Sequence, residues 1–130
     1  MFFSIEASDG VPIYEQVVRQ VKFAIAEEAL QPGQLLPSIR ALSVDLAINP
    51  NTVARAFQQL QSEGILENVR GRGLAVCAGV ADRCKLVRRE LITERLRSAL
   101  DEALRGGLEA AEIESIVQQQ LRELAGQVTQ

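Results

Sequence analysis

Three local signals between residues 36 and 73 occur in an order that restricts the folds open to this chain. Ser38 follows a proline and is a typical helix N-cap, and Asn49 precedes Pro50 as a cap followed by a first helical residue. Residues 70–73 (RGRG) lie between two short apolar runs, as in a hairpin whose tip needs glycine. Two short helices followed by a basic hairpin form a winged helix-turn-helix, a fold that binds double-stranded DNA.

Helical periodicity is also present on both sides of this region. Behind Pro12, apolar residues recur at helical spacing over residues 13–25, and the pattern is broken at residues 31–33 (QPG). A longer helical pattern starts near residue 82, is broken at residues 106–107 and is followed by a last helix. The chain therefore carries more helix than a winged domain alone requires.

The predicted fold class is mainly α with a small β-hairpin, divided into two domains. A winged helix-turn-helix occupies residues 1–78, and a two-helix C-terminal tail occupies residues 79–130. In the helix that starts at Pro50, the apolar and polar residues lie on opposite faces. The apolar face is assigned to the core and carries Val53, Phe57 and Leu60; the polar face carries Asn51, Thr52, Arg55 and Gln59.

The charge balance limits how the chain can attract a nucleic acid. Its 130 residues include 14 Lys and Arg against 17 Asp and Glu, and the formal net charge is −3. The general field therefore does not attract DNA, and binding requires a locally basic face. Between residues 38 and 73 the acids are Asp45, Glu63 and Glu67, all outside the three motifs, so such a face is available.

Composition argues against an enzyme. The chain has no histidine, which removes Ser-His and Cys-His schemes and the usual zinc sites. Cys77 and Cys84 are not spaced as a Cys-x-x-Cys pair. We expect no catalytic residue, no metal and no cofactor. The two cysteines are interpreted as part-buried thiols, with a redox switch as the alternative.

The chain shows no signal for a membrane. Its first residues lack a basic leader followed by an apolar run, and no segment approaches the roughly 20 apolar residues that a span needs. The sequence therefore favours a cytoplasmic protein with no membrane partner.

Three segments predict contacts with DNA. A reading helix enters the major groove with its first residues at the base edges, where asparagine pairs with adenine and arginine with guanine. The start of the preceding helix contacts the backbone, and a glycine-tipped wing approaches the phosphates or the minor groove. The predicted DNA-binding residues are Ser38, Arg40, Asn49, Asn51, Thr52, Arg55, Arg70, Gly71, Arg72 and Gly73.

As a set, these motifs resemble the GntR family of bacterial transcription regulators, specifically its short-tailed YtrA-like branch. The resemblance rests on residues 12–16 (PIYEQ), 33–40 (GQLLPSIR), 49–57 (NPNTVARAF), 60–66 (LQSEGIL) and 70–73 (RGRG). It implies a dimeric winged-helix repressor that binds an inverted-repeat operator, in a branch that often regulates neighbouring transporter genes.

The resemblance also assigns roles to single residues. Ser38 and Arg40 match the family's backbone contacts, residues 51–55 its reading helix and residues 70–73 its wing tip. This chain departs from the family at Ile39, where many members carry an acid, and at Ala54, where many long-tailed members carry an arginine. The reading helix therefore has fewer cations than in those relatives.

The tail predicts a homodimer. Two helices with continuous apolar stripes cannot bury both stripes alone, so we expect them to pair with a second subunit. The alternative is that the tail folds back onto its own winged helix. The stripes carry Val87, Leu91, Leu100, Ile113, Val117, Leu121 and Leu124.

Two other functions stay open at this point. The acidic balance and modest number of cations also fit a winged-helix module that binds proteins without specific DNA binding. A small molecule held between the tail and the winged domain is a possible addition to DNA binding, although no pocket motif identifies an effector. Steep salt dependence of duplex binding discriminates DNA binding from protein binding.

Overall fold

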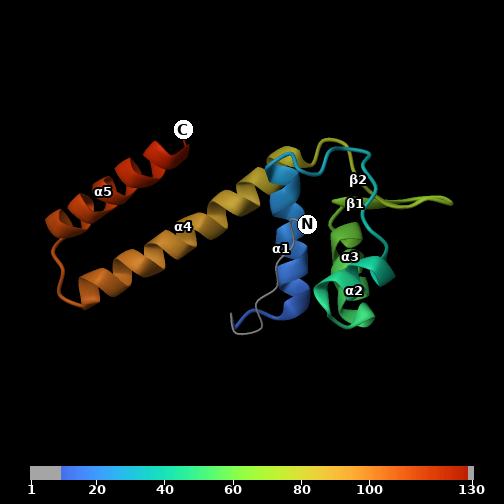
Figure 1. The fold of residues 1–130 in the computed structure, drawn as a ribbon, viewed down its shortest axis with the longest axis horizontal. Helices are drawn as coiled ribbons and strands as arrows, with labels where there is room; N and C mark the ends of the chain where they lie inside the picture. Colours follow the sequence, from blue (N-terminus) through green and yellow to red (C-terminus); the bar gives the residue numbers. More distant parts are fainter. Residues whose placement is uncertain (1–9, 129–130) are drawn as a thin grey trace. The chain divides into compact units, whose positions relative to one another are not determined.

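The computed structural model describes residues 10–128, which form two compact units (Figure 1). The first unit ends at Arg89 and the second begins at Glu90. The described part contains five helices and a two-stranded antiparallel hairpin, so the mainly helical winged-helix prediction is confirmed. The elements are α1 (Ile13–Ala26), α2 (Ile39–Leu46), α3 (Pro50–Ser62), β1 (Leu66–Val69), β2 (Gly73–Val76), α4 (Ala81–Arg105) and α5 (Ala110–Val128).

Both helix caps expected from the sequence are present. Ser38 Oγ accepts a hydrogen bond from the Ala41 N–H at 3.0 Å and begins α2. Asn49 Oδ1 accepts from the Asn51 N–H at 2.8 Å, and Pro50 is the first residue of α3. Each side chain satisfies a backbone donor that the helix itself leaves unpaired.

The core of the first unit forms around α3, as the periodicity predicted. Val53, Phe57 and Leu60 are all buried, and they belong to the same cluster as Val17 and Val21 of α1. In Figure 1, α1 stands beside α3, and the two helices are in contact. The face of α3 that carries these three residues is therefore fixed toward α1.

The first helix spans Ile13–Ala26, in agreement with the pattern predicted over residues 13–25. Pro12 is its N-cap residue, one position before the helix begins. Glu28 takes a positive φ of 66°, and the N–H groups of Ala29 and Leu30 both bond to the Ala24 carbonyl. This reversal buries Leu30, so packing ends the helix before the proline does.

The wing is an antiparallel hairpin with Val69 opposite Gly73 at its tip. Gly71 and Gly73 have φ values of 77° and 122°, as expected for glycines in a tight turn. A third segment, which the sequence did not reveal, pairs with β2: the N–H of Gly33 bonds to the Val76 carbonyl and that of Leu36 to the Leu74 carbonyl. This pairing holds the start of α2 against the base of the wing.

The beginning of α4 belongs to the first unit. Cys84, on its first turn, is fully buried in the core with Val80. The first compact unit therefore extends to Arg89. The domain boundary after residue 78 is a prediction from the sequence.

Both cysteines are free. Burial raises the pKa of the Cys84 thiol. Burial also raises the pKa of Cys77, and the Glu67 carboxylate, 3.7 Å from its Sγ, raises it further. A raised pKa keeps a thiol protonated near neutral pH, which disfavours the redox alternative.

The second unit contains the rest of α4 and the whole of α5, joined by a turn in which Gly107 has a φ of 100°. Among the described residues of this unit, one hydrophobic side chain, that of Ile113, is buried. Its apolar stripes are otherwise exposed, at Ile92, Leu96, Leu100, Leu104, Leu108, Ile116, Val117, Leu121 and Leu124.

An ion pair connects α1 to the end of α3. Lys22 Nζ lies 2.8 Å from Glu63 Oε1, and the Arg83 guanidinium donates to the Glu63 carbonyl at 2.7 Å. Burial raises the pKa of Glu63, but hydrogen bonds from Lys22 and Gln59 and the charges of Lys22 and Arg83 outweigh it, so the net pKa is lowered.

Glu63→Gln is expected to lower the free energy of unfolding by about 1–2 kcal/mol at pH 7, because it removes a charge-assisted hydrogen bond. A carboxyl with a lowered pKa in the folded state contributes stability above its unfolded pKa and loses it as pH falls. Denaturant unfolding at several pH values checks this. The difference between the wild type and the variant should vanish in acid; a constant difference would contradict the assignment.

Candidate nucleic-acid interface

The predicted DNA-binding residues lie at the surface on three elements of the first unit. They come from the start of α2, the first turns of α3 and the tip of the β1–β2 hairpin. Thr52 is half-buried, and the other nine are exposed. They are therefore accessible to a partner as large as a DNA duplex.

The four arginines of this set are not neutralised by acids. Within residues 10–128, Arg40, Arg55, Arg70 and Arg72 make no ion pair. Three cations outside the set do form ion pairs: Lys22 with Glu63, Arg88 with Glu27 and Arg105 with Asp101. The acidic chain thus has local positive charge at the wing and the helix-turn-helix, as a nucleic-acid surface requires.

The two helix caps retain hydrogen-bond donors. Ser38 uses an oxygen lone pair to cap α2, which leaves its O–H free to donate. Asn49 likewise caps α3 through Oδ1 and keeps its NH₂ group available. A phosphate group has only acceptors, so each side chain is able to cap its helix and bind a phosphate at the same time.

The outer face of α3 carries one exposed residue that the sequence did not single out. Gln59 is half-buried, as is Thr52, and its Nε2 donates to Glu63 Oε2 at 3.1 Å. Gln58 is exposed and lies three residues after Arg55 and seven after Asn51, on the same face of the helix. The helical spacing of Gln58 from Asn51 and Arg55 could therefore have identified Gln58 from the sequence.

A recess of about 410 Å³ lies between the starts of α1 and α3. The Arg55 guanidinium stacks on the Tyr14 ring there, with Cζ 3.8 Å from the ring centroid. The recess brings four of the predicted residues together with two residues of α1. Its lining is Ile13, Tyr14, Asn49, Asn51, Thr52 and Arg55.

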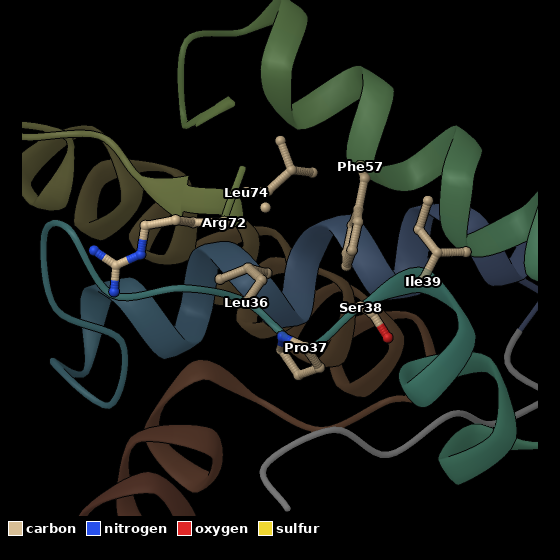
Figure 2. Close-up of a pocket in the computed structure, with 8 residues that line it drawn as sticks. Leu36, Pro37, Ser38, Ile39, Phe57, Arg72 and Leu74 are labelled. Carbon is tan, nitrogen blue, oxygen red and sulfur yellow. The ribbon is translucent and has the colours of Figure 1, made fainter. Parts of the chain in front are cut away.

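A second cavity, of about 270 Å³, separates the base of the wing from the start of α2 (Figure 2). Figure 2 shows the Phe57 ring reaching from α3 toward Leu36, with Arg72 and Ile39 on opposite sides of it. Ser38, Arg72 and Gly73 all line this cavity. The structure therefore brings Ser38, at the start of α2, together with part of the wing, whereas Arg40, Arg70 and Gly71 line neither hollow.

Comparison with known proteins defines the class. Residues 13–76 match the family described as bacterial regulatory proteins, gntR family. The HTH-type transcriptional repressor YtrA of Bacillus subtilis is 34% identical over 105 residues, which are 81% of this chain and 81% of that protein. The matched region contains every predicted DNA-binding residue.

Solved structures show the same fold. A GntR family transcriptional regulator from Listeria monocytogenes is similar with a TM-score of 0.70 and 26% identity, covering 86% of this chain and 97% of the other. AraR(DBD) in complex with operator ORX1 is similar with a TM-score of 0.50 and 26% identity, covering 59% of this chain and 93% of that one.

The chain is a winged helix-turn-helix transcriptional regulator that binds DNA. It belongs to the GntR family of bacterial regulatory proteins. The matched relatives are transcriptional regulators and not enzymes, which confirms the prediction that no catalysis occurs here.

Neither a membrane span nor a metal cluster is found in the described part of the chain. Residues 10–128 contain no helix that is both long and apolar enough to cross a membrane. In the same residues, no three His, Cys, Asp or Glu side chains gather in a way that would hold a metal ion.

Ser38→Asp is expected to separate the two uses of this side chain. Aspartate caps a helix as well as serine, so the free energy of unfolding should stay within about 0.5 kcal/mol of the wild type. The added negative charge faces the phosphates, so affinity for every duplex should fall by about tenfold or more. Fluorescence anisotropy with labelled duplexes and denaturant unfolding measure the two quantities.

Ser38→Asn is the matched control, because asparagine caps equally well and still donates without adding charge. Equal DNA affinity of the Asp and Asn variants would show that Ser38 does not contact a phosphate.

Proposed function

We propose that this regulator binds an inverted-repeat operator as a homodimer and represses transcription, acting in the cytoplasm without a cofactor. Residues 51–58 of α3 read bases in the major groove, the start of α2 clamps the backbone and the wing contacts phosphates or the minor groove. By family resemblance, the regulated genes include neighbouring transporter genes. The similarity to AraR(DBD) in an operator complex supports this mode of binding.

The observation that carries the proposal is the set of unpaired arginines on three adjacent DNA-binding elements. Arg40, Arg55, Arg70 and Arg72 are exposed and make no ion pair with described residues. Phosphate binding requires cations that are not already neutralised by acids. A surface that contacts only solvent has no such requirement. Four exposed cations are therefore available to phosphates on these elements.

Base reading is assigned to the exposed side chains of α3. Asn51 offers a donor and an acceptor to adenine, and Arg55 offers paired donors to guanine. Gln58, on the same face, is a third candidate, since glutamine also pairs with adenine. Because Ala54 replaces the arginine of long-tailed relatives, Arg55 is the cation of this face and its contact carries more of the specificity.

Dimerisation is assigned to the second unit. Leu96, Leu121 and Leu124 are 57%, 60% and 55% exposed, an unusual state for three leucines on two adjoining helices. Burying such stripes in a second subunit removes a large apolar surface from water. A two-fold dimer would also present two reading helices to the two halves of an inverted repeat.

Selection of random duplexes by the purified protein, with sequencing of the bound pool at two salt concentrations, tests this function. The expected result is an enriched inverted repeat. Binding without enrichment would contradict sequence-specific reading, and absence of binding that depends on salt would favour a protein-interaction module.

Single arginine variants divide into two classes. Arg55→Ala should relax base preference at one position of each half-site, by about 1–3 kcal/mol of discrimination. Arg40→Ala and Arg72→Ala should weaken all duplexes similarly and flatten the slope of log K against log salt by about 0.9 for each phosphate that the variant no longer neutralises. Anisotropy titrations at several salt concentrations distinguish the classes. If Arg55→Ala changes neither affinity nor preference, α3 does not read the groove as assigned.

Leu121→Glu is expected to produce a monomer, because a carboxylate at an apolar interface costs about 3 kcal/mol, or roughly a hundredfold in the dimer Kd. Sedimentation velocity at micromolar concentration should give twice the chain mass for the wild type and the single mass for the variant. Gln118→Glu adds the same charge on the same helix, outside the apolar stripe, and should remain dimeric. A monomeric wild type would contradict the dimer.

A further inference from the structure

We propose that Tyr14 of α1 is a positioning residue for base reading, since it holds the Arg55 guanidinium in an orientation ready to donate to DNA. This inference rests on the proposed function, in which Arg55 reads a base. It adds α1 to the elements that determine which sequence is recognised.

The geometry is that of a stacked pair between two helices. Arg55 Cζ lies 3.8 Å from the centroid of the Tyr14 ring, well within the roughly 6 Å range of a cation–π contact. Tyr14 itself is half-buried and packs against the core cluster, so the ring is anchored. Its hydroxyl donates to Glu15 Oε1 at 3.3 Å on the same helix.

Stacking engages one part of the guanidinium and leaves the rest free. The guanidinium carbon lies over the ring, 3.8 Å from its centroid. The N–H donors of a guanidinium lie in its plane and point outward from its edge. Arg55 has no ion pair within residues 10–128 that would occupy these donors. The edge is therefore available for a bidentate contact with guanine or a phosphate.

The stacked pair lies beside the residues proposed to contact DNA. Asn49, Asn51 and Thr52 line the same recess as Tyr14 and Arg55. An arginine restrained there in the free protein loses less side-chain entropy when it binds than a mobile one does. Removing the ring should therefore weaken binding through Arg55 alone.

The hydroxyl is not needed for this role. Tyr14→Phe keeps the aromatic face and should retain wild-type affinity and base preference, whereas Tyr14→Leu removes the face but keeps an apolar side chain. Arg55→Lys keeps the charge but loses the planar fork, so it should behave like Tyr14→Leu in base preference.

The experiment uses the full chain and the operator obtained by selection. Anisotropy titrations measure the affinity of each variant for the operator and for duplexes substituted at every half-site position. Tyr14→Leu is expected to lower operator affinity about two- to fivefold for each half-site and to relax preference at the position that Arg55→Ala also relaxes. Tyr14→Leu combined with Arg55→Ala should be no worse than Arg55→Ala alone.

Phe23→Leu is the matched control. Phe23 is also on α1, is also half-buried and also lies under an arginine, with Arg88 Cζ 5.7 Å from its ring centroid. Both leucine substitutions remove a similar aromatic ring, so unfolding midpoints show whether they cost similar stability. Only Tyr14→Leu should alter base preference.

Additive effects of the Tyr14 and Arg55 substitutions, or unchanged base preference in Tyr14→Leu, would overturn the positioning role while leaving operator binding intact. A wild-type protein that selects no sequence would overturn the proposed function, and with it the role of Tyr14.

Discussion

Burial of one face of α3 is the constraint on which the rest of the first unit depends. Val53, Phe57 and Leu60 are enclosed with residues of α1, so α3 has a single rotational setting. That setting exposes Asn51 and Arg55. Without it, a polar helix with capping residues would have no defined outer face, because propensity alone does not orient a helix.

Two long-range connections join the elements of the first unit. The backbone of Gly33 and Leu36 pairs with β2, which sets the start of α2 beside the base of the wing. Lys22 and Arg83 meet at Glu63, which joins α1 and the beginning of α4 to the end of α3. The backbone contacts and the reading contacts proposed for this regulator thus belong to one packed body, which keeps their spacing constant.

Much of this arrangement was accessible from local sequence. The caps at Ser38 and Asn49 and the core face of α3 all depend on spacing within one element, and the structure agrees with each. Other details depend on tertiary packing. Leu30 turns back into the core directly after α1 ends at Ala26, and Gln59 is hydrogen-bonded to Glu63 beside the Lys22 pair.

The sequence by itself determined the order of the elements, the helix starts, the turn glycines and the residues that carry charge, because each depends on neighbours a few positions away. Only the tertiary structure decided that Arg55 stacks on Tyr14, 41 positions earlier, and that residues 33–36 extend the hairpin. These features join segments distant in the chain, and their positions follow from the packing of whole elements, which no local pattern encodes.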